Sequence, residues 1–173
     1  SSQYHNALTN YGFAQGDIGK AMTTFSETRS ALRAVIGYDD ESEINSEKKN
    51  YETKKKAFEG FMQDIESKMM TKAGKEAYQQ AESALNGYWT KADAILQQGS
   101  TTDKIASSAA QHKEIDELGP MYDEIYASLK NIMDIKVAKG NSVQGTLNVV
   151  KYILIILTVL IIVFSVYMST HLG

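Results

Sequence analysis

The stretch that decides the fold is "KYILIILTVLIIVFSVYM", residues 151–168, near the end of the 173-residue chain. From Tyr152 to Gly173 there is no Lys, Arg, Asp or Glu, although 23% of the whole chain is charged. An uncharged run of about 17 residues forms a helix of about 26 Å, close to the thickness of a bilayer core. Tyr152 and Tyr167 stand near its ends, where aromatic side chains favour the membrane interface. We therefore predict a transmembrane helix over residues 147–170, because a small bundle could not bury so long a run as a core helix.

Upstream of this span, apolar residues recur at the spacing of packed helices. In the first segment large residues return every seven positions: Tyr4, Tyr11, Ile18, Phe25 and Leu32. A heptad of this kind is typical of helices that pack side by side. Similar stripes predict helices over about 4–36, 41–70, 75–97 and 103–146. Because the connections are short, neighbouring helices run antiparallel. The sequence thus predicts an all-α fold, an up-down-up-down four-helix bundle over residues 1–146.

The turns carry recognisable end signals. Gly37 follows the first helix, where a glycine can take the left-handed conformation, and Asp40 with Glu43 fits a capping box. Gly99 closes the third helix, and Thr101 or Thr102 is the predicted cap of the fourth.

The fourth helix is predicted to run on into the membrane. Its apolar positions space by seven in two series: Ile115, Tyr122 and Leu129, with Leu118, Ile125 and Ile132 between them. Val143 and Val150 continue the first series. Pro120 lies inside the pattern and predicts a bend, because proline removes one backbone hydrogen bond. Gly140 and Asn141 form the weakest joint of this long helix.

Composition excludes several classes of function. The net charge is −3, so the chain lacks the basic surface of a nucleic-acid-binding protein. There is no cysteine, and none of the three histidines follows a glutamate by three positions, as a di-iron bundle requires. Phosphate-binding glycine loops and nucleophile elbows are missing from the sequence as well. We expect neither an enzyme nor a metal or other cofactor.

The chain resembles the four-helix-bundle sensor domains of bacterial methyl-accepting chemotaxis proteins. The resemblance rests on "TRSALRAVIGYDD" (28–40), "EAYQQAESALNGYWTKADAILQQGSTTDKIASS" (76–108) and the long fourth helix that enters residues 151–168. It implies a homodimer in the bacterial cytoplasmic (inner) membrane, with the bundle outside and a first transmembrane helix before it. It also implies that a small-molecule ligand displaces the fourth helix. The signal would reach a chemotaxis kinase and a coupling protein through a cytoplasmic region that begins at about residues 171–173.

The resemblance also implies where a ligand binds. In members that sense amino acids, arginines on the first helix hold the ligand's carboxylates near the dimer interface, and Arg29 and Arg33 match them. They are the only arginines of the chain and lie four residues apart, on one helical face. Arginine suits bidentate carboxylate binding. The competing interpretation is a pair of surface arginines that bridge to Glu27 or to a neighbouring helix.

Counting from the turn adds further candidates. Residues of the fourth helix at the height of Arg29 are Gln111 and His112, and in the family polar residues there help to bind ligand, so Ser108 joins them. Trp89 falls at a similar height on the third helix. An ordinary, partly exposed histidine is the competing interpretation of His112.

Two other functions fit part of the pattern. The same module fronts some membrane histidine kinases. A tail-anchored protein of the syntaxin type would also join a helical domain to a C-terminal anchor. Lys136, Lys139 and Lys151 precede the span, and by the positive-inside rule they would place the bundle in the cytoplasm. The fourth segment, however, has no clear central glutamine layer, which a syntaxin-like protein requires.

Overall fold

The computed structural model describes residues 13–171, and these residues are helical apart from three short connections. The helices are α2 (Phe13–Gly37), α3 (Glu41–Ser67), α4 (Lys72–Gly99), α5 (Lys104–Lys113) and α6 (Gly119–His171), with a π-helical segment η2 (Glu114–Leu118) between α5 and α6. The part of the first predicted helix from Tyr4 to residue 12 lies outside the described residues, as do residues 172–173.

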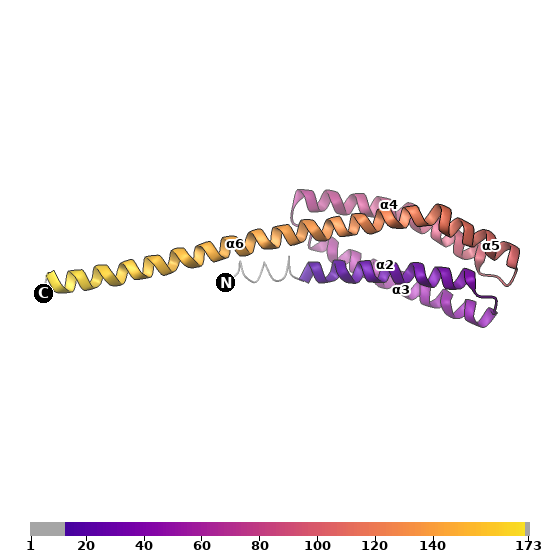
Figure 1. Cartoon of the computed structure of the whole chain (residues 1–173), viewed down its shortest axis with the longest axis horizontal. Coiled ribbons are helices and arrows are strands. Elements are labelled where there is room, and N and C mark those ends of the chain that lie inside the picture. The colour runs from indigo at the N-terminus through magenta and orange to yellow at the C-terminus, as the bar shows by residue number, and fades with distance from the viewer. Residues whose placement is uncertain (1–12, 172–173) are drawn as a thin grey trace.

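The helices form an antiparallel up-down-up-down bundle (Figure 1). α2 and α3 make one hairpin, and α4 makes the other with α5, η2 and the first part of α6. The rest of α6 extends past the turn between α3 and α4. The predicted fold class is therefore confirmed, because the described residues contain no strand and the fourth helix continues into an apolar segment.

An aromatic layer joins the two hairpins at mid-height. Each helix contributes at least one ring: Phe25 from α2, Phe58 from α3, Tyr88 and Trp89 from α4, and Tyr122 from α6. The ring of Phe25 lies 5.2 Å from Phe58 and 4.9 Å from Tyr88, and it stacks on Tyr122 at 4.8 Å. Phe25, Phe58 and Tyr88 are almost completely buried. Large buried rings contribute strongly to a core, so this layer sets the spacing of all four helices.

The turn at the far end of α2 and α3 matches one predicted signal and contradicts another. Asp40 caps α3, because its carboxylate accepts a hydrogen bond from the Glu43 amide at 3.0 Å. Gly37 was predicted to take the left-handed conformation, and this was wrong: no described residue has a positive φ angle.

The connection after α4 also differs from the sequence prediction. Asp103 caps α5 by accepting from the Ile105 amide at 2.9 Å, so the predicted cap at Thr101 or Thr102 was wrong. Thr101 instead accepts a hydrogen bond from the Asp103 amide. Gly99 is required here for space and not for its φ angle. A Cβ atom at this position would lie 2.4 Å from Cγ2 of Ile36, so only glycine lets α4 approach α2 this closely.

The fourth helix carries an irregularity that the heptad pattern does not show. In η2 the Gly119 amide donates to the Glu114 carbonyl, five residues back. A π-helical turn holds more residues than an α-helical turn, so it offsets the phase of the helix before it. Ala110 is consequently buried, whereas Ile115, predicted in the seam, is 59% exposed. Pro120 falls in the first turn of α6, where a missing amide is tolerated.

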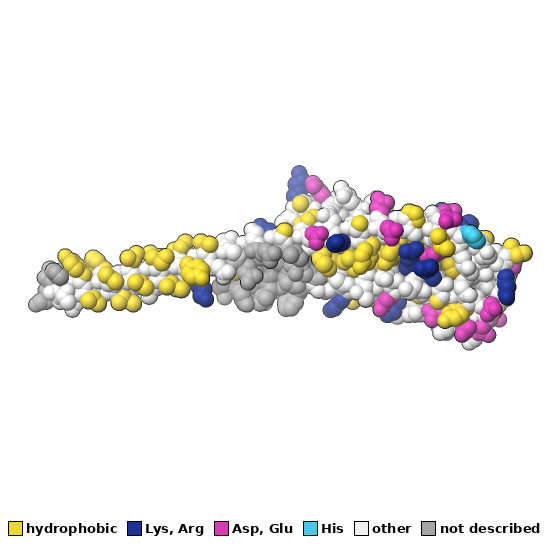
Figure 2. Space-filling model, viewed as in Figure 1, with side chains coloured by type: hydrophobic (Ala, Val, Ile, Leu, Met, Phe, Trp, Pro, Cys, Tyr) yellow, Lys and Arg dark blue, Asp and Glu magenta, His cyan; other side chains and the backbone are white. Residues whose placement is uncertain are grey.

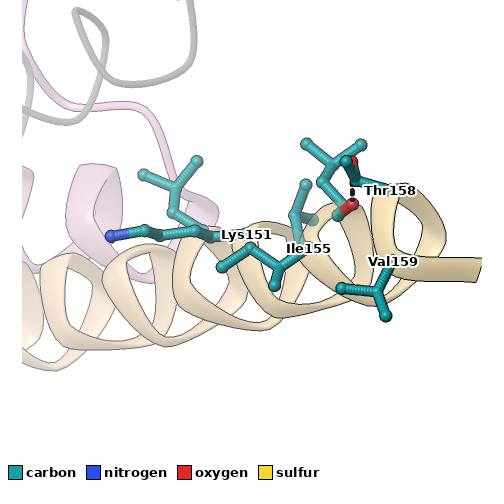
Figure 3. Close-up of a pocket in the computed structure, with 7 residues that line it drawn as sticks. Lys151, Ile155, Thr158 and Val159 are labelled. Atoms are coloured by element: carbon teal, nitrogen blue, oxygen red, sulfur yellow. Dashed lines mark hydrogen bonds between the residues drawn. The ribbon is translucent and has the colours of Figure 1, made fainter. Parts of the chain in front are cut away.

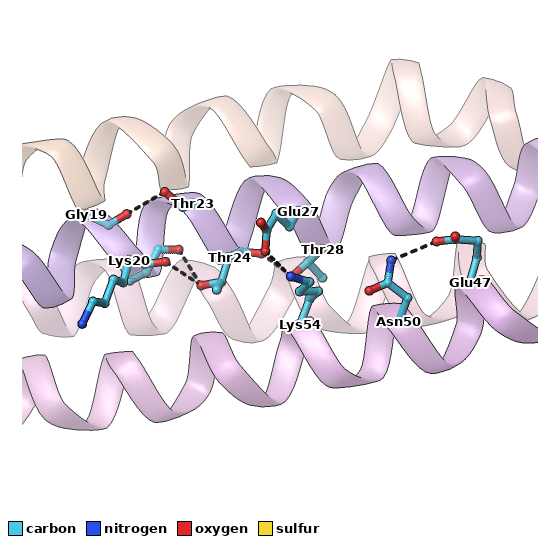
Figure 4. Close-up of polar contacts among 10 residues, drawn as sticks. Gly19, Lys20, Thr23, Thr24, Glu27, Thr28, Glu47, Asn50 and Lys54 are labelled. Carbon is cyan, nitrogen blue, oxygen red and sulfur yellow. Dashed lines mark hydrogen bonds and ion pairs between the residues drawn. The ribbon is translucent and has the colours of Figure 1, made fainter.

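Figure 4 shows polar contacts along α2 and α3, one of which joins the two helices. Glu27 forms an ion pair with Lys54 at 2.7 Å. The hydroxyls of Thr23, Thr24 and Thr28 donate to backbone carbonyls one turn earlier on their own helix. Glu27 is thus paired with a lysine of α3. Of the two bridges that the competing interpretation allowed for the arginines, the structure has the one to a neighbouring helical segment, at Glu114 of η2.

A chain of polar contacts ties three helices together at the end of the bundle from which α6 leaves. The Lys68 ammonium lies 2.5 Å from the Asp17 carboxylate of α2. The Lys136 ammonium of α6 donates to the Lys68 carbonyl, and burial lowers the pKa of Lys136 below its ordinary value. α6 is therefore held to α2 and to the end of α3 just before it leaves the bundle.

Beyond the bundle, α6 is long and apolar enough to cross a membrane over Gly145–Thr170. Its backbone is helical through residues 140 and 141, the predicted weak joint. Apolar side chains cover the visible surface of this segment (Figure 2). Figure 3 shows a shallow hollow along it, where Thr158 donates its hydroxyl to the Leu154 carbonyl at 2.9 Å. Such internal bonds let a threonine face lipid at low cost.

Candidate functional site

Two arginines of α2 meet one buried carboxylate at the start of η2. Nε of Arg29 lies 2.6 Å from Oε1 of Glu114, and Nε of Arg33 lies 3.6 Å from Oε2. The Glu114 side chain is 1% exposed, that of Arg29 is 20% exposed and that of Arg33 is 60% exposed. Arg29 is thus committed to Glu114, whereas Arg33 is bound more loosely and still faces solvent.

Three features hold the Arg29 guanidinium in place. A buried carboxylate needs a charged, hydrogen-bonded partner, and Arg29 supplies it. The guanidinium carbon lies 4.7 Å from the centre of the Tyr122 ring, within the range of a cation–π contact. Gly119 leaves room for it, since a Cβ atom there would lie 3.1 Å from a guanidinium nitrogen. The arginine therefore has a fixed position between α2 and α6.

A small open pocket lies beside Arg33. It has a volume of about 200 Å³ and is lined by Arg33, Ile36, Gly37, Gln111, Glu114 and Ile115. The Gln111 amide donates to the Ile36 carbonyl at 2.8 Å, which satisfies one of the last carbonyls of α2. The pocket thus combines an exposed guanidinium, a polar amide side chain and an apolar wall formed by Ile36 and Ile115.

The structure brings together three of the six predicted ligand-binding residues: Arg29, Arg33 and Gln111. Ser108 and His112 lie on the exposed side of α5, where Nδ1 of His112 contacts the Ser108 carbonyl at 2.8 Å, and neither lines the pocket. Trp89 lies elsewhere as well. Its ring packs against Phe25, Phe58 and Tyr88 at 5.1–5.9 Å and borders a separate groove between α3 and α4.

Glu114 is the central residue of this site that sequence reasoning missed. The heptad pattern placed its neighbour Ile115 in the seam instead. One signal was present: Ala110, Glu114 and Leu118 are spaced four apart, on one helical face. An acid between two core positions, opposite the only two arginines of the chain, indicates a buried ion pair.

A comparison with models of known protein families shows which family has this architecture. The family model described as a four helix bundle sensory module for signal transduction matches residues 14–149. The chain belongs to this sensory module family. No curated protein and no solved structure shows a significant match.

Membership also bears on the competing functions. The sensory module is a signalling domain of methyl-accepting chemotaxis receptors and not a catalytic family. Together with the apolar end of α6, it makes the chain part of a membrane-anchored receptor. The match therefore favours the receptor over a syntaxin-like protein, and it places the arginine site inside a domain whose role is sensing.

Proposed function

We propose that this sensory module is the ligand-binding input domain of a bacterial transmembrane chemoreceptor, and that its ligand is a small carboxylate or amino acid. The proposal rests on the observation that Arg29 and Arg33 contact the Glu114 carboxylate at different distances. Arg29 holds this carboxylate at 2.6 Å, while Arg33 stays 3.6 Å away and 60% exposed beside an open pocket. An arginine fork with spare donors is well suited to a carboxylate from solution.

The same geometry supplies a route for the signal. A ligand carboxylate on Arg33 competes with Glu114, which sits at the start of the π-helical segment that leads into α6. Any change in the Arg33–Glu114 distance acts on the segment that fixes the phase of α5 against α6. Because α6 runs on toward the membrane as one helix, a shift at η2 is passed along it. This supports signalling by displacement of the fourth helix.

The receptor is proposed to work as a homodimer, with the bundle outside the cytoplasmic (inner) membrane and with a chemotaxis kinase and a coupling protein as its partners inside. Family membership supports this arrangement. The exposed pocket face of α2, α5 and η2, which includes Ile115 of η2 at 59% exposure, supports a second copy packing near the site. The proposed ligand contacts also include Ser108, His112 and Trp89, which a ligand would reach from outside the arginine pocket or together with the second copy.

The test is a thermal-shift screen of the full chain in detergent with the natural amino acids, succinate and malate. A ligand that raises the melting temperature should lose its effect in Arg33→Ala and in Arg33→Lys, because lysine keeps the charge but not the fork. Lys104→Ala is the matched control, since Lys104 is an exposed cation at the same end of the bundle. If an active compound stabilised Arg33→Ala as much as the unchanged protein, the arginine pocket would not be the binding site.

A further inference from the structure

A second hollow lies between α3 and α4 and shares no lining residue with the arginine pocket. It is a groove of about 270 Å³. Met62 and Leu85 belong to its apolar lining and are each 5% exposed. Trp89 stands at its border as a partly buried ring. The groove therefore has the apolar base and aromatic wall that small organic ligands favour.

The rim of this groove is acidic and carries no compensating base. Glu59 and Glu66 of α3 and Glu82 of α4 line it, and no Lys or Arg does. None of the three carboxylates takes part in an ion pair within the described residues, although seven other acidic residues do. The nearby Lys55 is engaged elsewhere, with Asp93 at 2.9 Å. Clustered like charges repel one another, so a bound cation would reduce the repulsion among these carboxylates.

Tyr78 adds a phenol hydroxyl to the residues that line the same groove. Its side chain lines the groove and is 4% exposed. The nearest charges acting on it are Glu66 and Glu82, and together with burial they raise the pKa of Tyr78 to about 12. An ammonium group between these carboxylates would donate to the phenol oxygen and to both acids.

The aromatic wall is already shown to accept an ammonium group. The Lys55 ammonium lies 4.9 Å from the centre of the Trp89 ring. Glu59, which lines the groove, is one helical turn from Lys55 on α3. A single metal ion fits less well, because no group of His, Cys, Asp or Glu in the described residues is close enough to hold one.

We propose that the groove between α3 and α4 binds a small organic diammonium cation, with one end among Glu66, Glu82 and Tyr78 and the other at Glu59. The alkyl chain between the two ends lies over Met62 and Leu85. Glu59 and Glu66 are seven residues apart, which is about 10 Å along a helix. This spacing matches a chain of about seven carbons between two amines. The site is separate from the arginine pocket and does not depend on the proposed carboxylate ligand.

The test is isothermal titration of the full chain in detergent with 1,7-diaminoheptane. We expect saturable binding, with no binding of 1,7-heptanediol, which has the same length and no charge. Affinity should fall about tenfold or more in Glu66→Gln/Glu82→Gln, because each acid forms a charge-assisted hydrogen bond. Tyr78→Phe should weaken binding less, and Arg33→Ala should leave it unchanged, which separates this site from the carboxylate site.

The matched control is Glu124→Gln/Asp134→Asn, which removes the same two charges from exposed positions of α6. This variant should bind the diamine as the unchanged protein does. Equal losses in the two double variants would mean that the diamine senses only the overall negative charge, and the proposal would be wrong. It would also be wrong if the unchanged protein bound no diamine, or if the diol bound equally well. Melting curves of each variant check that the bundle is still folded.

Discussion

Removal of the Glu114 side chain is the sharpest test of how the two hairpins are joined. In Glu114→Ala the Arg29 guanidinium loses the partner at 2.6 Å and remains between α2 and α6. Breaking one side of a buried ion pair costs about 3–5 kcal/mol. Arg29 is 20% exposed and keeps its contact with the Tyr122 ring, so part of this cost is relieved by water. We expect the bundle to lose about 2–3 kcal/mol.

This loss can be measured by thermal melting of the full chain in detergent, followed by circular dichroism at 222 nm. For a domain of this size the melting temperature should fall by about 4–12 °C. Glu117→Ala is the matched control, because Glu117 is three residues away and its ion pair with Lys91 lies on the surface. That variant should melt close to the unchanged protein.

The double variant Glu114→Ala/Arg29→Ala distinguishes an ion pair from a packing effect. If the two residues stabilise each other, the double variant is less destabilised than the sum of the single ones, by about 1–3 kcal/mol. Additive losses, or a Glu114→Ala melting temperature equal to that of Glu117→Ala, would refute the view that the arginine–carboxylate contact holds α2 to the fourth helix.

Three further predictions concern packing and ionisation. Gly99→Ala should destabilise the bundle by about 1–3 kcal/mol in the same melting assay, because the new Cβ atom would lie 2.4 Å from Cγ2 of Ile36. The control is Gly60→Ala, where a Cβ atom would have nothing within 4 Å, and it should stabilise the bundle by about 0.5–1 kcal/mol. Phe25→Ala should cost about 3–5 kcal/mol, since this fully buried ring contacts aromatic rings from each of the other helices. A loss below about 1 kcal/mol would contradict the shared layer. Tyr78 should ionise with a pKa of about 12 in the folded chain. The stabilising effect of its neutral phenol is therefore complete below pH 10 and is lost as the pH rises from 10 toward 12. The difference in absorbance at 295 nm between the unchanged protein and Tyr78→Phe measures this ionisation, and a midpoint near pH 10 would show that the hydroxyl is solvated.

Much of the fold could be predicted because it depends on periodicity. The recurrence of Phe25, Leu32 and their equivalents marks a face that must be buried, and each helix needs only its own sequence to show it. The Asp40 cap is equally local, since a side chain and an amide three residues apart form it. Ile115 was misplaced because a π-helical turn changes the phase without leaving a break in the heptad.

Only half of the residues predicted for the candidate site come together in the structure. Arg29 and Arg33 stand out as the only arginines, and Gln111 follows from counting down the fourth helix. Trp89 lies at the predicted height but faces α3 and not the arginines, because height along a bundle does not give direction around it. The cap at Asp103 was missed for a related reason: three neighbouring residues can each cap a helix, and packing selects one of them.

The sequence by itself determined that this chain is an all-α bundle with an apolar helix at its end, because helical periodicity and an uncharged run are properties of the chain alone. Only the tertiary structure decided that Glu114 pairs with the arginines of α2, and that Glu59, Glu66, Glu82 and Tyr78 share one groove. These contacts join residues far apart in sequence. Burial and charge pairing depend on which helices meet and at what rotation, and that rotation is set by the packing of all four helices together.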